Sequence, residues 1–179
     1  MDQLVAHQRA QDAFAAMLAK VSADQLDAPT PCSEWKVRDV VGHVIAGNHR
    51  IAGTTPAAAN DMVTLIEAHA TSARAAQAAF AAPDGLTRYI EMPFGSVPGS
   101  VMIPLRTSDV LTHAWDMARA TGQPTDVDPE LAAEMLEDSR KRITTDFRGQ
   151  GRPFGEEQPC DPGRPAADRL AAFLGRDVA

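Results

Sequence analysis

The sequence predicts an all-α protein: a four-helix bundle with a long crossover connection and additional helices at its C-terminal end. The chain is rich in alanine, the residue with the highest helix propensity, and only 5% of its residues are aromatic. Apolar residues recur at helical spacing in several segments, and stretches rich in proline and glycine separate those segments. With 179 residues, of which 44% are hydrophobic and 23% charged, we expect one globular domain over residues 1–179.

The first helix is predicted over residues 4–21, where Phe14, Met17 and Leu18 recur at helical spacing. Two prolines in the linker over residues 22–35 end it, and Ser33 or a neighbour is expected to cap the next helix. That second helix is predicted over residues 35–53 and carries an aliphatic stripe on one side. The stripe consists of Val37, Val40, Val41, Val44, Ile45 and Ala52.

The opposite side of the second helix combines small residues with a histidine. Gly42, Ala46 and Gly47 lie around His43 there, and Arg50 follows one turn later. Side chains this small allow a neighbouring backbone or a ligand to approach closely. We therefore expect this side to face either another helix or a bound molecule.

The middle of the chain combines helix signals with β signals. An alanine-rich helix is predicted over residues 58–82 and ends at Pro83-Asp84-Gly85. Residues 88–92 and 100–103 are rich in β-forming side chains and flank a loop of proline and glycine over residues 93–99. These segments predict a short hairpin or an extended crossover that is long enough to span the bundle.

Three more helices are predicted towards the C-terminal end. The helix over residues 105–121 ends at Gly122, with Pro124 beyond it, which is a regular C-terminal signal. The helix over residues 129–145 begins with Pro129, and Asp128 is expected to cap it. Residues 148–165 are predicted to be a loop, and residues 166–174 a short last helix.

Charge and hydropathy exclude several classes of function. The formal net charge of −7 and the isoelectric point near 5.1 argue against a nucleic-acid-binding protein with a basic surface. No run of about 18 apolar residues occurs, and Met1-Asp2-Gln3 does not open a signal peptide, so we expect a cytoplasmic protein without a membrane span. Cys32 and Cys160 lie far apart, and no disulfide is expected in a reducing compartment.

The stretch SDVLTHAWDMARATG over residues 108–122 carries the sharpest candidate site. Asp109, Thr112, His113 and Asp116 fall within two helical turns and share one face. Asp109 and His113, four residues apart, can present a carboxylate oxygen and an imidazole nitrogen to one metal ion. The alternative is an ion pair on a solvated helix surface, which would contribute only a few tenths of a kcal/mol.

A third metal ligand must come from another helix, and His43 is the best donor. It lies in the middle of the second helix among small residues, whereas His69 on the third helix is a weaker alternative. We call His43, Asp109 and His113 the candidate triad. Two imidazoles and one carboxylate leave coordination positions open, which is typical of a catalytic or ligand-binding metal.

Zinc suits the candidate triad, and nickel(II) or iron(II) are alternatives. Asp116 and Asp39, each one turn from a triad histidine, are candidates to orient the imidazoles, although exposed helix residues would give the same pattern. Cys32, just before the second helix, is either a reactive thiol or, as we favour, a small packing residue.

The tryptophans and arginines of the sequence give weaker indications of a function. Trp35 and Trp115 are interpreted as core anchors. Arg88, Arg106 and Arg119 can bind an anionic substrate but are interpreted as ordinary surface residues. The sequence holds no glycine-rich phosphate loop, no serine nucleophile elbow and no CxxC pair of cysteines.

The segments TPCSEWKVRDVVGHVIAG, PFG and DVLTHAWDMARATG, together with the ending DRLAAFLGR, carry a family resemblance. The chain resembles the N-terminal metal-binding domain of mycothiol-dependent maleylpyruvate isomerase, in the DinB-like (YfiT-like) superfamily. The resemblance implies a four-helix bundle with a divalent metal held from its second and fourth helices. Its ligand positions fall on His43, Asp109 and His113. The isomerase has glutamate at the position of Asp109, and the shorter side chain adds ligation through a bridging water as an alternative.

Three hypotheses for the function follow from these residues and the resemblance. The first is a mycothiol-dependent transferase or isomerase in which the metal activates the thiol. The second is a protein that binds a metal and a thiol without turnover, and the third is a metal-free helical interaction module. The resemblance is to the N-terminal domain of the isomerase, and we expect no counterpart of the isomerase's C-terminal domain within residues 1–179. The expected partners are a small-molecule substrate or thiol, and the expected state is a monomer or homodimer.

Overall fold

The computed structural model describes residues 1–32, 34–92, 95–149 and 154–179, and it confirms the all-α fold class. The bundle helices are α1 (Gln3–Leu18), α2 (Val37–Ala52), α3 (Met62–Ala81) and α4 (Gly99–Thr121). The remaining elements are η1 (Ala23–Asp27), β1 (Tyr89–Met92), β2 (Gly95–Pro98), α5 (Pro129–Arg142), η2 (Thr145–Phe147) and α6 (Ala166–Phe173). The two strands pair in antiparallel register within the crossover between α3 and α4.

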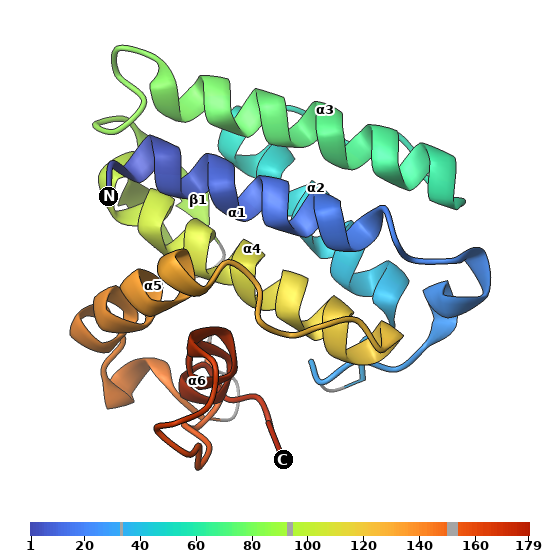
Figure 1. Ribbon diagram of the computed structural model, residues 1–179. Helices are drawn as coiled ribbons and strands as arrows, with labels where there is room; N and C mark the ends of the chain where they lie inside the picture. Colours follow the sequence, from blue (N-terminus) through green and yellow to red (C-terminus); the bar gives the residue numbers. More distant parts are fainter. Residues whose placement is uncertain (33, 93–94, 150–153) are drawn as a thin grey trace.

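Helix α4 lies at the centre of the molecule. Figure 1 shows α1 and α3 on one side of it and α5 and α6 on the other. It packs along α1 and also contacts α2, α5 and α6, so residues 110–118 are buried without a break. This position explains why α4 lacks the single solvated face that an ordinary amphipathic helix would have.

The hydrophobic core joins α1, α2 and α4 with the C-terminal helices. Phe14 and Leu18 of α1 and Trp115 of α4 are among its largest fully buried side chains. The valines of the aliphatic stripe predicted for α2 are part of this core, because Val37, Val40, Val41 and Val44 are fully buried.

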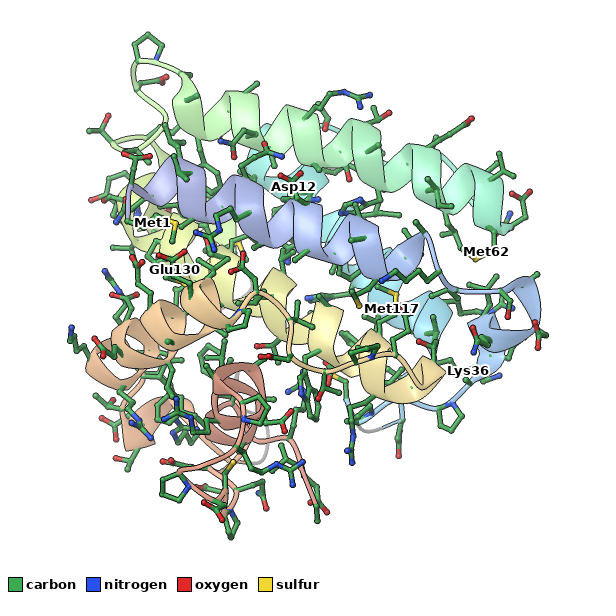
Figure 2. The ribbon with its side chains drawn as sticks, in the orientation of Figure 1. Met1, Asp12, Lys36, Met62, Met117 and Glu130 are labelled. Carbon is green, nitrogen blue, oxygen red and sulfur yellow. The ribbon has the colours of Figure 1, made fainter. Side chains whose placement is uncertain are left out.

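At the Met1 end of α1, polar contacts tie that helix to α5. Arg9 of α1 donates hydrogen bonds to Asp128 and Glu130. Figure 2 shows Glu130 close to Met1 at that end of the bundle. The predicted cap is also present, because the Asp128 carboxylate accepts a hydrogen bond from the backbone N–H of Leu131.

The crossover differs from the prediction in one respect. Residues 100–103, predicted as a β segment, form the beginning of α4, and the second strand lies earlier, at Gly95–Pro98. Met102 and Ile103 are buried with Phe80 and Ile90 in a second apolar cluster. A short apolar run fits a strand or a helix equally well, and packing against this cluster decides for the helix.

The remaining boundaries shift by a few residues. The linker before α2 contains η1, α3 begins at Met62 rather than 58, and α5 ends at Arg142 rather than 145. The predicted cap Ser33 and the first two residues of the PFG motif, Pro93 and Phe94, lie outside the described residues. Among the helices that the structure describes, none is long and apolar enough to cross a membrane.

Candidate metal centre

The polar stripe of α4 faces the interior of the molecule. Thr112, His113 and Asp116 are buried, and Asp109 at the edge of the stripe is partly exposed. The alternative of a solvated helix face is therefore wrong for this stripe. Burying the ionisable groups of His113 and Asp116 without partners would be costly, so we expect each to contact an oppositely charged or hydrogen-bonding group.

The structure brings the three residues of the candidate triad together from α2 and α4. His43 Nε2 lies 3.4 Å from Asp109 Oδ2, and His113 Nε2 lies 3.3 Å from Asp109 Oδ1. One donor atom from each residue lies within 4.8 Å of the other two. Two ligands at about 2 Å from a tetrahedral ion stand roughly 3.3 Å apart, so these separations match those of a metal site.

His113 is held on its other ring nitrogen by Asp116. The distance from His113 Nδ1 to Asp116 Oδ2 is 2.9 Å, and Arg176 donates to both Asp116 oxygens at 2.9 Å. The contact with Asp116 is shorter than the 3.3 Å from Nε2 to Asp109 Oδ1, and this favours the proton on Nδ1 and the lone pair on Nε2 when the ring is neutral. Carboxylates hold metal-binding histidines in this way.

Neighbouring charges keep both carboxylates of the site ionised. Burial opposes ionisation of Asp109, but the charges of His113 and Arg106 outweigh it and hold the pKa of Asp109 well below its usual range. Burial also opposes ionisation of Asp116, and hydrogen bonds from His113 and Arg176 lower its pKa. Burial would lower the pKa of His113, yet Asp109 and Asp116 outweigh it and raise that pKa to about 8.

Arg106 contacts the candidate triad and is a functional candidate that the sequence interpretation set aside as a surface residue. Its side chain is 6% exposed, so the interpretation as a surface arginine is wrong. From α4 it pairs with Asp109 and donates to the Val44 carbonyl of α2 at 2.6 Å and to Asn48 Oδ1 at 3.2 Å. The spacing of three residues between Arg106 and Asp109 is a helical ion-pair spacing, and it is the signal from which the contact could have been predicted.

The small side of α2 makes room for this arginine. A Cβ atom added at Gly47 would lie 2.6 Å from Arg106 Cζ, whereas one added at Gly42 would meet nothing within 4 Å. The expectation that small residues let a neighbour approach is therefore confirmed at Gly47. The neighbour is the guanidinium group of Arg106.

Cys32 and Trp35 lie beside the candidate triad. Cys32 Sγ accepts a hydrogen bond from Arg176 at 3.3 Å, and its sulfur, His113 and Asp116 form a second cluster of potential ligands. Burial raises the pKa of the Cys32 thiol to about 11, so the thiol is protonated at neutral pH. The half-buried Trp35 ring packs at 4.9 Å from the His43 ring and 5.8 Å from the His113 ring, in addition to its contact with the core.

Two other candidates lie away from the triad. Asp39 is exposed, and its carboxylate accepts from the backbone N–H of Lys36, so it caps α2 and does not orient His43. His69 lies in a buried polar cluster, with Nε2 at 3.1 Å from Gln11 Oε1, and the prediction of His69 as an alternative ligand is wrong. Trp115, by contrast, is the core anchor that was predicted.

The candidate triad opens to solvent on one side. The side chains of His43 and Asp109 are 38% and 32% exposed, while that of His113 is 5% exposed. Two cavities of about 270 and 240 Å³ occur elsewhere, one between α1, α4 and α5 and the other beside α6. No residue of the triad lines either cavity.

Comparison with known proteins identifies the family. The model of the mycothiol maleylpyruvate isomerase N-terminal domain matches residues 7–91. Two Mycobacterium tuberculosis proteins, the uncharacterized protein MT0763 of strain CDC 1551 and the uncharacterized protein Rv0738 of strain H37Rv, are each 55% identical to this chain over 183 residues. Each match covers 99% of this chain and 100% of the relative. The chain belongs to the mycothiol maleylpyruvate isomerase N-terminal domain family.

Solved structures share the fold of this family member. A crystal structure of the mycothiol-dependent maleylpyruvate isomerase superposes with a TM-score of 0.67, and that of a histidine-to-alanine mutant of the enzyme with 0.60. Each match covers 86% of this chain and 73% of the other, at 16% identity. These likenesses confirm the predicted helical-bundle fold.

The family model reaches only one residue of the candidate triad. His43 on α2 lies within residues 7–91, while Asp109 and His113 on α4 lie beyond them. The two α4 residues are therefore candidates because their donor atoms lie within 4.8 Å of that of His43. Arg176, which holds Asp116 from the C-terminal segment, also lies outside the matched range.

Proposed function

We propose that this protein binds one divalent metal ion through His43 Nε2, His113 Nε2 and a carboxylate oxygen of Asp109. The observation that carries the proposal is the approach of these three donors, from two helices, to within 4.8 Å of one another. Two imidazoles and a carboxylate are a donor set for zinc, with nickel(II) and iron(II) as alternatives. Such a set leaves a coordination position open.

The position of Asp109 supports direct ligation rather than a bridging water. Its two oxygens lie 3.3 and 3.4 Å from the two imidazole nitrogens, and these separations leave space for one ion between the three side chains. We therefore propose that the shorter side chain of aspartate reaches the ion directly.

We propose further that the bound metal serves a thiol-dependent transferase or isomerase reaction. The mycothiol-dependent isomerase among the structural neighbours supports a thiol, and mycothiol in particular, as the co-substrate. A divalent ion acts as a Lewis acid that lowers the pKa of a water or thiol bound to it. The chain itself supplies the exposed approach beside His43 and Asp109, and Trp35 shields both imidazole rings.

Metal analysis of protein purified without a histidine tag tests the metal site. We expect about one equivalent of zinc after zinc addition and dialysis, and a loss of most of it in His43→Ala and His113→Ala. His49→Ala is the matched control, because His49 lies on the same helix but contacts Thr54 instead of the triad. Less than about a tenth of an equivalent in the wild type would favour a metal-free helical module.

A turnover assay separates an enzyme from a binding protein. The zinc-loaded protein is mixed with mycothiol and an electrophilic substrate, and product formation is followed with and without a chelator. We expect turnover that chelation abolishes and zinc restores. Thiol binding to the zinc-loaded protein without turnover of any electrophile would leave the non-catalytic binding protein as the better hypothesis.

A further inference from the structure

We propose that Arg106 is a positioning and charge-balancing residue that makes the metal-loaded site select an anionic ligand, of which a thiolate is the example in the proposed function. The inference rests on the proposed metal site. It adds a role for a residue outside the candidate triad and a chemical class for the ligand at the open position.

The contacts of Arg106 give it a fixed place beside Asp109. One guanidinium nitrogen pairs with Asp109 Oδ2, and the other donates to the Val44 carbonyl at 2.6 Å. Asp109 Oδ2 is also the oxygen nearest to His43, while Oδ1 faces His113. Arg106 therefore fixes the rotation of the carboxylate so that one oxygen is turned to each imidazole.

A buried arginine at this place is not explained by stability alone. Its side chain is 6% exposed, and removing a guanidinium from water carries a desolvation penalty that its ion pair must offset. The helix α2 accommodates it at Gly47, where a Cβ would lie 2.6 Å from Arg106 Cζ. The space on α2 and the charge on α4 together place a permanent cation next to the proposed metal ligand.

The charges around the candidate triad cancel once its histidines are neutral, which is the state in which they bind a metal. Asp109 belongs to the triad and pairs with Arg106. Asp116 contacts the triad and pairs with Arg176. The two histidines are neutral when they act as ligands. A divalent ion thus leaves a net charge of about +2 in a partly desolvated site, and an anionic ligand lowers this electrostatic energy far more than a neutral one.

Removal of the Arg106 charge has opposite effects on cation binding and on anion binding. Arg106→Gln retains a hydrogen-bond donor for Asp109 but removes the positive charge, and Arg106→Lys retains the charge. We expect Arg106→Gln to bind cobalt(II) at least about tenfold more tightly and azide, added to the cobalt-loaded protein, at least about tenfold more weakly. Both constants are measured from the cobalt absorption spectrum, and Arg106→Lys is expected to remain within about threefold of the wild type.

A purely structural role would give a different result. Equal weakening of cobalt binding in Arg106→Gln and Arg106→Lys, or an unchanged azide constant in Arg106→Gln, would overturn the inference. A wild type that binds no cobalt would overturn the proposed metal site, and this inference with it. If the wild type binds cobalt and Arg106→Gln has the same cobalt and azide binding constants, this inference is overturned and the proposed metal site stands.

A glycine pair on α2 tests the same point if Arg106→Gln fails to fold. Gly47→Ala forces the guanidinium out of its place, whereas Gly42→Ala on the same helix meets no neighbouring atom. We expect Gly47→Ala to change both the cobalt and the azide constants and Gly42→Ala to change neither. Wild-type constants in a folded Gly47→Ala protein would contradict a role for the position of Arg106.

Discussion

At the scale of single residues, the orientation of the His113 ring depends on the carboxylates that contact it. Its two ring nitrogens face two different carboxylates, Asp109 at 3.3 Å and Asp116 at 2.9 Å. The contact with Asp116 leaves Nε2 as the nitrogen available to a metal. The proposed ligand is therefore oriented by a residue one turn away and by Arg176 behind that residue.

Asp116→Asn tests this orientation. The amide can offer its N–H group to Nδ1, so the imidazole is no longer held in one tautomer, and we expect zinc affinity to fall by about 10- to 100-fold. The measurement is a zinc titration in competition with a chromophoric chelator. Asp39→Asn is the control, since Asp39 caps α2 without touching the site. Equal zinc affinity in Asp116→Asn and the wild type would contradict the orienting role.

The sequence predicted the candidate triad, misjudged Arg106 and did not reveal Arg176. The four-residue separation of Asp109 and His113 and the small neighbours of His43 were enough to propose the candidate triad. Arg176 lies 60 residues from Asp116, and no local pattern connects them. Arg106 was misjudged because a sequence does not reveal that α2 has room for its guanidinium group.

At the scale of elements, α4 determines the architecture. It is covered by α1, α2, α5 and α6, so its apolar and polar residues are both buried. The length and number of the helices were predictable from apolar spacing and from breaks at proline and glycine. The start of α4 was not, because residues 100–103 are an apolar run whose packing against Phe80 and Ile90 is a tertiary effect.

Leu111→Ala tests the central position of α4. Leu111 is 1% exposed within the core, so we expect its truncation to lower the free energy of unfolding by about 2–5 kcal/mol, measured by urea denaturation. Val63→Ala on α3 is the control, because Val63 is 66% exposed and its truncation should change that free energy by less than about 0.5 kcal/mol. Similar effects in both variants would contradict the burial of α4.

At the scale of the whole molecule, a buried polar cluster links the helices of the bundle. Gln11 of α1 bonds to Asn48 of α2 and to His69 of α3, and Asn48 in turn accepts from Arg106. His7 of α1 joins the cluster through Gln11.

That residues 1–179 form a single cytoplasmic domain, as a monomer or homodimer, stays a prediction.

This cluster predicts a loss of stability in mild acid. Burial, with a contribution from Arg106, lowers the pKa values of His7 and His69 to about 4. Between pH 6.5 and 4 the unfolded chain binds protons that the folded chain does not, so the free energy of unfolding falls as the pH falls. The loss amounts to about 3 kcal/mol for each histidine.

Urea denaturation at pH 7 and pH 4.5 measures this loss, and a His69→Gln variant should show a smaller difference between the two conditions. The lowered pKa values of Asp109 and Asp116 act below about pH 3.8 and leave this window unaffected. The raised pKa of His113 adds stability to the metal-free protein as the pH falls from about 8 to 6.5, so between pH 7 and 4.5 it offsets a small part of the loss. A free energy of unfolding independent of pH between 7 and 4.5 would contradict the neutral buried histidines.

The most direct test of the proposed metal site is a crystal structure of the zinc-soaked protein with an anomalous difference map. The proposed site predicts one zinc peak about 2.0–2.2 Å from His43 Nε2, His113 Nε2 and an oxygen of Asp109. A peak held instead by Cys32 and Asp116 on the other side of His113, or no peak at either cluster, would contradict it.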